Sequence, residues 1–358
     1  MSPTRLDPDN FSVFTYDEAE PNFFNLTKLN EAVNTYFKKS CLLVKLNEGG
    51  FHKVYDDIGK LDSKSLGAVV RVASPAFPKD KMLSEIATLK YIAAFTTVPV
   101  PQVFTWNVDA TNPVGAECMI MEKIRGISPY GDKWESLPLP IKLNVVKQVA
   151  KHLAILFSLR FQQIGSLYFA VDGVPEYPGI SQATFKSLTK MRGPFDSSSG
   201  YLASFLRTKL FKIDNFREAV RESITSNDVV ASIENARKVI NLGLELCRYY
   251  PGDRPIPWPL HDPERPFSLM LGDFRLTNIL IDEETGDITG YIDFERTIVA
   301  PLWPCATVPQ WIPNPRGGMA KWYGGTPEEQ EQIWATFYTA MSSTTGTSQG
   351  ASGGKLMS

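Results

Sequence analysis

The sequence predicts an α+β fold with two lobes, the first rich in strands and the second built mainly from helices. Its 358 residues are enough to form two lobes around a cleft. Strand-like segments dominate the first third of the chain, and long helical patterns follow, interrupted by one hairpin. We therefore expect an N-terminal lobe at 1–122, a helical C-terminal lobe at 123–340 and a disordered tail at 341–358.

The N-terminal lobe should contain five strands and a helix between the third and fourth, with a further helix ahead of the sheet. Apolar residues spaced by three or four positions predict the helices, and β-branched or alternating runs predict the strands. The helices are expected at 27–37 and 79–95. The strands are expected at 41–46, 51–58, 67–73, 98–106 and 116–124.

Helical periodicity continues through the larger lobe. Three long helices are expected at 139–161, 201–213 and 228–250. A last helix should begin at "TPEE", with Thr326 as N-cap, Pro327 at the first helical position, and Glu328 and Glu329 in the first turn. The Ser- and Gly-rich end that follows has the composition of a disordered segment.

Composition excludes several classes of protein. The net charge of -2 provides no basic field, so neither nucleic acid nor a membrane surface is expected as a partner. The four cysteines and three histidines are scattered, which disfavours a zinc site and suggests reduced thiols. The acidic N-terminus resembles no secretory or mitochondrial leader, and no apolar run could span a bilayer. The expected compartment is therefore the cytosol.

A hairpin late in the chain gathers its few polar groups. The segments "NILI" and "ITGYI" flank the loop "DEETGD", a typical hairpin pattern. With the turn centred between Thr285 and Gly286, Asn278 and Asp293 fall at mirror positions at the open end. Since paired strands lie about 5 Å apart, these two side chains should be neighbours. Asp273 precedes them on a loop that bends at a glycine.

This arrangement of oxygen-bearing side chains suits phosphoryl transfer. Asn278 and Asp293 supply the hard oxygens that Mg²⁺ prefers, and Asp273 could accept a proton from an attacking hydroxyl. A D-x-x-x-x-N motif followed by a hairpin and an aspartate is the catalytic apparatus of kinase-like folds. The alternative is that Asp273 and Asn278 cap local turns, and that Asp293 merely ends a strand.

A second set of residues lies in the N-terminal lobe. Gly49 and Gly50 stand between the first two strands, where backbone N–H groups could approach a phosphate. Arg71 is a charge on the apolar third strand, and Glu85 on the next helix could pair with it. The alternative interpretation is an ordinary turn and a structural ion pair, although four features in this order are much less frequent by chance than any one.

With these residues in place, the sequence resembles the aminoglycoside phosphotransferase and choline-kinase-like superfamily. Within it, the resemblance is to fungal phosphotransferase-family proteins related to altered inheritance of mitochondria protein 9. It runs from about residue 10 to residue 338, and its most specific motif is "LGDFRLTNILID". The other motifs include "NEGGFHKVY", "VVRVA", "SEIATLKYI", "GAECMIMEKIRG" and "YIDFE".

The resemblance implies a protein-kinase-like fold that binds ATP and Mg²⁺. It assigns Asp273 to the catalytic base, and Asn278 and Asp293 to the metal. Glu295 matches a charged position of the same motif without an assigned role. It also implies that the segment "MEKI" is the hinge that meets the adenine through backbone groups of Glu122, Lys123 and Ile124.

Three departures from the family pattern stand out. Leu271 replaces the usual His before Gly-Asp, which removes a brace of the loop but no proton acceptor. Arg71 replaces the usual strand-three Lys, and its planar fork binds phosphate differently; Lys53 is an alternative cation. A Ser/Gly tail stands where further helices usually follow, so the helical lobe is expected to be incomplete.

We expect an ATP- and Mg²⁺-dependent phosphotransferase acting on a hydroxyl of a small molecule. The alternative is a catalytically weak or inactive pseudokinase that binds nucleotide or scaffolds partners; protein phosphorylation is disfavoured because no "APE" motif follows the hairpin. The acceptor is undetermined, and its contacts should lie within 181–250 and after residue 301. Trp303, Trp311 and Trp322 are candidate pocket residues or core residues. Resemblance alone adds mitochondria as a second compartment.

Overall fold

The computed structural model describes residues 23–50, 52–59, 65–74, 79–169, 193–222, 224, 228–249, 266–315 and 325–351. They form two compact units that draw on separate parts of the chain. The first unit comprises Met1–Val149, Phe274–Glu295 and Pro313–Phe337. The second comprises Ala150–Asp273, Arg296–Ile312 and Tyr338–Ser358. The hairpin therefore belongs to the same unit as the N-terminal strands, whereas Asp273 closes a segment of the second unit.

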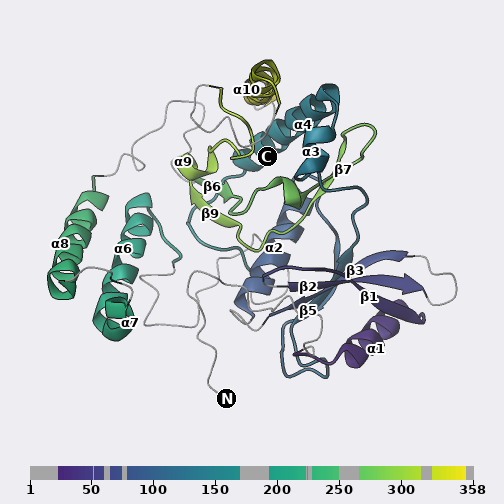
Figure 1. Ribbon diagram of the computed structural model, residues 1–358, viewed down its shortest axis with the longest axis horizontal. Helices are drawn as coiled ribbons and strands as arrows, with labels where there is room; N and C mark the ends of the chain where they lie inside the picture. The colour runs from purple at the N-terminus through teal and green to yellow at the C-terminus, as the bar shows by residue number, and fades with distance from the viewer. Residues whose placement is uncertain are drawn as a thin grey trace, which may run out of the picture. The chain divides into compact units, whose positions relative to one another are not determined.

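A five-stranded antiparallel sheet forms the centre of the first unit, in the order β1-β2-β3-β5-β4 (Figure 1). All five strands lie where the sequence predicted them, with shifted ends. Their bounds are Cys41–Glu48 (β1), His52–Gly59 (β2), Ser65–Ala73 (β3), Val103–Asn107 (β4) and Cys118–Glu122 (β5). Runs of β-branched and aromatic side chains favour this pleated, half-buried surface.

Helix α1 (Leu26–Phe37) covers one face of the sheet (Figure 1). It begins at Asn25, whose side chain accepts a hydrogen bond from the Lys28 N–H at 3.0 Å, as an N-cap residue does. Leu29 and Val33 point to the sheet and are buried. The core on this face contains Phe24, Leu29, Val33, Cys41, Leu43, Tyr55, Ala68, Val70, Val72, Val114, Ala116 and Ile120.

Helix α2 (Asp80–Phe95) lies on the opposite face of the sheet (Figure 1). Alternation along β3 gives Val70 and Val72 to the α1 face, so Val69, Arg71 and Ala73 face α2. Eight residues of α2 are buried, including the charged Glu85 at 0% exposure. The α2 face of β3 thus carries the buried cation Arg71.

The hairpin consists of β7 (Ile279–Ile281) and β8 (Ile288–Tyr291), but its register differs from the prediction. Ile279 pairs with Tyr291, and a register shift follows between Leu280 and Ile281. The Ile292 N–H donates to the Asn278 carbonyl at 3.0 Å. The expectation that Asn278 faces Asp293 is wrong by one residue. The turn is centred between Glu284 and Thr285, one residue before the assumed position, and the extra residue of the bulge in β8 recovers only part of that shift.

The second unit contains a helical group and a short two-stranded sheet. Helices α6 (Ser198–Asn215) and α8 (Val229–Cys247) pack side by side, with the short α7 (Arg217–Glu222) next to them (Figure 1). Strand β6 (Phe267–Met270) pairs antiparallel with β9 (Ile298–Pro301), which leads into α9 (Leu302–Cys305). Within this unit Trp311 is 3% exposed and Trp303 is 48% exposed, and Trp322 lies outside the described residues.

Three further helices complete the described chain: α3 (Asp132–Ser136), α4 (Leu139–Ser158) and α10 (Pro327–Ala351). Thr326 caps α10 as predicted, because its Oγ accepts the Glu329 N–H at 3.3 Å while its own N–H donates to the Glu329 carboxylate at 3.1 Å. Helix α10 continues through Ala351, well into the stretch for which the sequence predicted disorder. The last seven residues of that stretch lie outside the described part of the chain.

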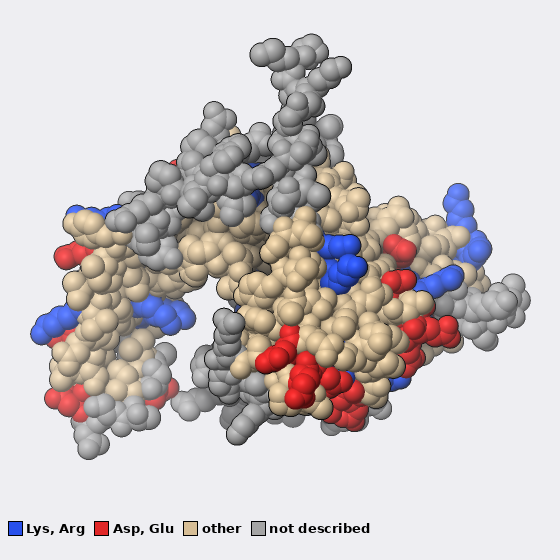
Figure 2. All heavy atoms as spheres, turned by 90° about the horizontal axis from the view of Figure 1, so that it is seen from above, with Lys and Arg blue, Asp and Glu red and all other residues tan. Residues whose placement is uncertain are grey.

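Charge on the surface is mixed. On the face drawn in Figure 2, Asp and Glu side chains gather in small groups and Lys and Arg in others, and no continuous basic field covers the described part of that face. Among the described residues, no helix is both long and apolar enough to cross a membrane.

Candidate active site

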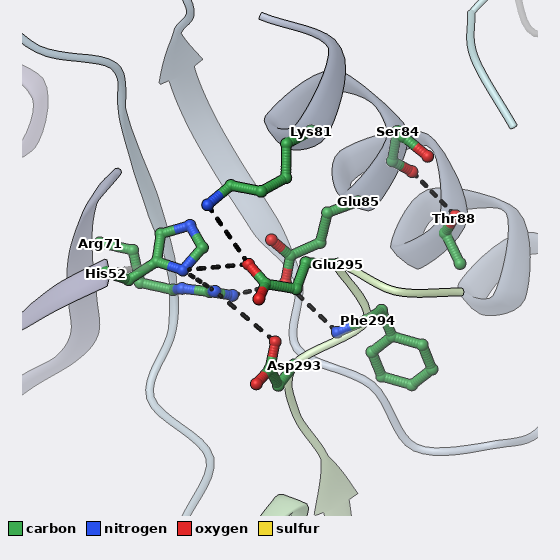
Figure 3. A network of polar contacts seen from close by, with 9 residues as sticks. All are labelled: His52, Arg71, Lys81, Ser84, Glu85, Thr88, Asp293, Phe294 and Glu295. Atoms are coloured by element: carbon green, nitrogen blue, oxygen red, sulfur yellow. Dashed lines mark hydrogen bonds and ion pairs between the residues drawn. The ribbon is translucent and has the colours of Figure 1, made fainter. Parts of the chain in front are cut away.

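A buried ion pair joins β3 to α2 in the first unit. The Arg71 Nη1 donates to Glu85 Oε1 at 2.5 Å, and the side chains are 9% and 0% exposed. The same carboxylate oxygen accepts the Phe294 N–H at 3.3 Å. Glu85 therefore ties the helix both to the strand-three cation and to the loop after β8 (Figure 3). The pairing that the sequence suggested between Arg71 and Glu85 is present.

Asp293 sits in that loop with an unusual backbone. Its φ is 66°, in the left-handed region that non-glycine residues seldom occupy and that aspartate tolerates better than most. Its Oδ1 is buried, has no hydrogen-bond partner among the described residues, and lies 3.9 Å from the Arg71 Nη2. A buried carboxylate oxygen that is aimed at a cation and lacks a hydrogen bond has the chemistry of a ligand atom for a metal.

Arg71, Glu85 and Asp293 form a polar cluster with three further residues, to which the sequence analysis assigned no role. These are His52, Lys81 and Glu295 (Figure 3). The His52 Nδ1 lies 2.9 Å from the Arg71 Nη2 and 3.3 Å from the Glu295 Oε2. The Lys81 Nζ lies 3.5 Å from the same Glu295 oxygen (Figure 3). Two signals were available in the sequence: Lys81 precedes Glu85 by four residues on one helical face, and His52 shares a strand face with Val54, the partner of Arg71.

Burial sets the electrostatics of the cluster. Desolvation lowers the pKa of His52 well below 6.5, with help from the charges of Arg71 and Lys81, so the imidazole is neutral. Burial and the Asp293 charge raise the pKa of Glu295 to about 7. Burial alone would lower the pKa of Arg71, but the negative charges around it raise it. The guanidinium therefore stays charged.

His52, Glu85 and Glu295 each offer a possible ligand atom within 4.8 Å of one another. Arg71 and Lys81 contact the same atoms, however, and two fixed positive charges disfavour a divalent cation there.

The other two predicted site residues are Asn278, in a short 3-10 turn, and Asp273, which precedes that turn in the sequence. Asn278 ends the turn Leu276–Asn278 in the first unit, and the Thr277 hydroxyl donates to its Oδ1 at 3.4 Å. Asp273 belongs to the second unit and follows Gly272. A Cβ on Gly272 would stand 2.3 Å from the Arg296 carbonyl oxygen, so the tight approach of these two segments requires glycine.

The glycine turn between β1 and β2 is closed by a hydrogen bond from the Gly49 N–H to the His52 carbonyl at 2.9 Å. Among the described residues, a Cβ on Gly49 would meet nothing nearer than the His52 carbonyl oxygen at 4.0 Å, so these residues leave room for a side chain. Gly50 lies in the same bend. Lys53, the alternative cation, lies on the face of β2 opposite Arg71, 3.9 Å from the Glu48 carboxylate, and is therefore not the cation that Glu85 holds.

The predicted hinge follows β5. The Glu122 N–H donates to the Gln102 carbonyl and the Lys123 N–H to the Gly67 carbonyl, both at 2.8 Å. The Lys123 ammonium also pairs with the Asp56 carboxylate at 2.5 Å. Ile124 packs toward Gly290, where a Cβ would come within 2.9 Å of its side chain. The first two N–H groups of the hinge are thus already used within the protein.

Fold and cluster together define a protein-kinase-like α+β fold of the kind found in aminoglycoside phosphotransferases. The structure is similar to aminoglycoside phosphotransferase APH(2'')-Ib, solved with ADP bound, with a TM-score of 0.53 and 13% sequence identity. The match covers 89% of this chain and 86% of that chain. At this identity the likeness is one of fold alone.

The sequence itself is similar to fungal proteins. It is 34% identical over 131 residues to a subtelomeric hrmA-associated cluster protein of Aspergillus fumigatus, covering 36% of this chain and 25% of the relative. It is 23% identical over 299 residues to altered inheritance of mitochondria protein 9 of Yarrowia lipolytica, covering 72% of this chain and 49% of that relative. The chain thus spans about half or less of these relatives, and no family model matches it.

Proposed function

We propose that the protein is an ATP- and Mg²⁺-dependent phosphotransferase that acts on a hydroxyl group of a small molecule. One observation carries the proposal. The buried Arg71–Glu85 pair lies beside Asp293, whose inward carboxylate oxygen lacks a hydrogen bond. A cation on the third strand, a helix Glu that holds it and an aspartate after the hairpin are the parts that phosphoryl transfer requires.

Nucleotide would bind along the glycine turn and the hinge. Gly49 has room for a side chain, so its glycine is better explained by a ligand that approaches the backbone closely than by the packing of the protein. Arg71 would contact phosphate oxygens through its fork of N–H groups. The N–H groups of Glu122 and Lys123 already donate to carbonyl groups of the protein. We therefore expect the N–H group of Ile124 to be the one in this segment that contacts adenine.

Asp293 and Asn278 would hold the Mg²⁺, and Asp273 would orient and deprotonate the acceptor hydroxyl. The bound metal would neutralise charge that develops on the transferred phosphoryl group. Asp273 precedes Asn278 by only five positions in the sequence, so the base and one metal ligand lie on one short stretch of chain.

Turnover of ATP across a panel of hydroxylated metabolites tests the proposal. Asp273→Ala should lower kcat by about 10²–10⁴-fold, the usual contribution of a general base. Glu283→Ala changes an exposed carboxylate of the hairpin loop and serves as the control, with activity unchanged. Full activity of Asp273→Ala would rule out the mechanism.

A nucleotide-binding pseudokinase is the second candidate. The observation that favours it is the enclosure of Arg71, which is 7% exposed and contacts Glu85, His52 and Asp293 together, as a structural ion pair would. Leu271 also favours a pseudokinase, because it replaces the His that usually supports this loop before Gly-Asp. Mg²⁺-dependent thermal stabilisation by ATP without transfer to any acceptor would favour this candidate over the enzyme.

Partners and compartment follow from the same proposal. We propose a small-molecule acceptor, with neither nucleic acid nor membrane as a partner, in keeping with a net charge of -2. The cytosol is the proposed compartment, whereas the relative from Yarrowia lipolytica carries a mitochondrial name. Fractionation of cells that express the tagged full-length protein decides between the two compartments.

A further inference from the structure

His52 is placed by two independent features of the first unit. On the sheet, it pairs with Ala73, so it lies diagonally across from Arg71 on the same face. In the glycine turn, its carbonyl accepts the Gly49 N–H at 2.9 Å. One residue therefore closes the turn with its backbone and reaches the strand-three cation with its side chain, which is 7% exposed.

The contact with Arg71 defines the chemistry of the imidazole. A guanidinium has only N–H donors, so in the contact at 2.9 Å with the Arg71 Nη2 the His52 Nδ1 takes the acceptor role, while the Glu295 Oε2 lies 3.3 Å from the same nitrogen. An imidazole that accepts at Nδ1 carries its proton on Nε2 and is neutral, in agreement with its lowered pKa. His52 holds one arm of the guanidinium in this way, while Glu85 holds the other arm through Nη1 (Figure 3).

We propose that His52 is a positioning residue that couples the glycine turn to the orientation of Arg71, and so tunes how strongly the phosphates of a bound nucleotide are held. The inference rests on the proposed nucleotide-binding function. Glu85 contacts the guanidinium through Nη1, and His52 adds a contact to Nη2, the nitrogen that also lies 3.9 Å from the Asp293 Oδ1. His52 fixes that nitrogen from the side of the turn.

Substitutions of His52 can test whether its Nδ1 makes the contact with Arg71. The side-chain oxygen of asparagine occupies about the position of Nδ1, whereas the amide end of glutamine reaches the position of Nε2. His52→Asn should therefore bind MgATP within about twofold of wild type, and His52→Gln and His52→Leu should bind about tenfold more weakly, as expected for loss of a hydrogen bond to a charged group. Calorimetric titration of the full chain gives the dissociation constants.

Adenosine and a matched control separate positioning from stability. Adenosine lacks phosphates, so its affinity should be the same in all three His52 variants. Tyr55→Leu removes a buried side chain from the opposite face of β2, in the α1 core, and should lower the melting temperature without changing the affinity for MgATP. A merely structural His52 would weaken adenosine and MgATP together.

The outcomes are distinct. Selective loss of MgATP affinity in His52→Leu and His52→Gln, with retention in His52→Asn, supports the inference. Wild-type affinity in His52→Leu, or equal loss for adenosine and MgATP, overturns it and leaves the proposed function intact. Failure of the wild-type protein to bind MgATP overturns the proposed function and this inference with it.

Discussion

At the scale of single residues, the sequence predicts the ion-pair partner of some charged groups of the first unit but not of others. Arg71 stands out on an apolar strand, and Glu85 on the following helix is its natural partner, as the structure confirms. His52, Lys81 and Glu295 converge on the same cluster from a strand, a helix and a loop. The helical spacing of Lys81 and Glu85 and the strand face of His52 indicate part of this cluster, but the contacts with Glu295 depend on how the strand, the helix and the loop pack.

Removal of the Glu85 carboxylate should lower the stability of the fold. Glu85→Ala leaves the Arg71 guanidinium buried without its carboxylate, and the free energy of unfolding should fall by about 3–5 kcal/mol. Glu31→Ala is the control, because its pair with Lys28 at 2.7 Å is exposed and such pairs contribute about 0–1 kcal/mol. Urea unfolding of both variants measures the difference. Equal losses would show that the buried pair does not stabilise the fold.

Glu295 should make stability depend on pH. Its pKa is raised to about 7 from an ordinary 4.5, so the folded state binds the proton more tightly than the unfolded state. The contribution of this group therefore becomes less favourable as pH rises from 4.5 to 7 and is constant above that.

Glu295→Gln removes this titration. Relative to wild type, the variant should gain on the order of 1–3 kcal/mol of unfolding free energy between pH 4.5 and pH 8. Urea unfolding of both proteins at the two pH values, without metal, measures the gain. A wild-type minus variant difference that is the same at both pH values would contradict the raised pKa.

At the scale of elements, the sequence located the strands and helices well because their patterns are local. The five strands of the sheet, α1, α2 and the capped start of α10 all lie at predicted positions. The hairpin was predicted correctly but its register was not, because the apolar pattern locates the turn only to within a residue: the turn is centred between Glu284 and Thr285, and a bulge between Leu280 and Ile281 offsets only part of that shift. Asn278 consequently lies opposite Ile292.

The cap of α10 gives a prediction at this scale. Thr326→Ala removes the oxygen that accepts the Glu329 N–H, and the free energy of unfolding should fall by about 1 kcal/mol. Thr326→Ser keeps that oxygen and serves as the control. Thermal unfolding of the two variants compares them, and equal melting temperatures would show that the capping box contributes nothing to stability.

At the scale of the whole molecule, the boundaries of the compact units depend on long-range contacts. The hairpin at 278–293 joins the N-terminal sheet in one unit although more than a hundred residues separate them in the chain. Asn278 and Asp293 belong to the first unit, and Asp273 belongs to the second. Composition and periodicity predicted two lobes. They could not predict which segments, far apart in the sequence, belong to the same compact unit.

The central claim is that the protein binds nucleotide through a metal held at Asp293. Calorimetric titration of the full chain with ATP, with and without Mg²⁺, tests it most directly when wild type and Asp293→Asn are compared. We predict that wild type binds ATP at least about tenfold more tightly with Mg²⁺, and that Asp293→Asn loses this dependence because a neutral amide is a weaker ligand for the metal. Binding that is equally tight without Mg²⁺, or unchanged in Asp293→Asn, would contradict the claim.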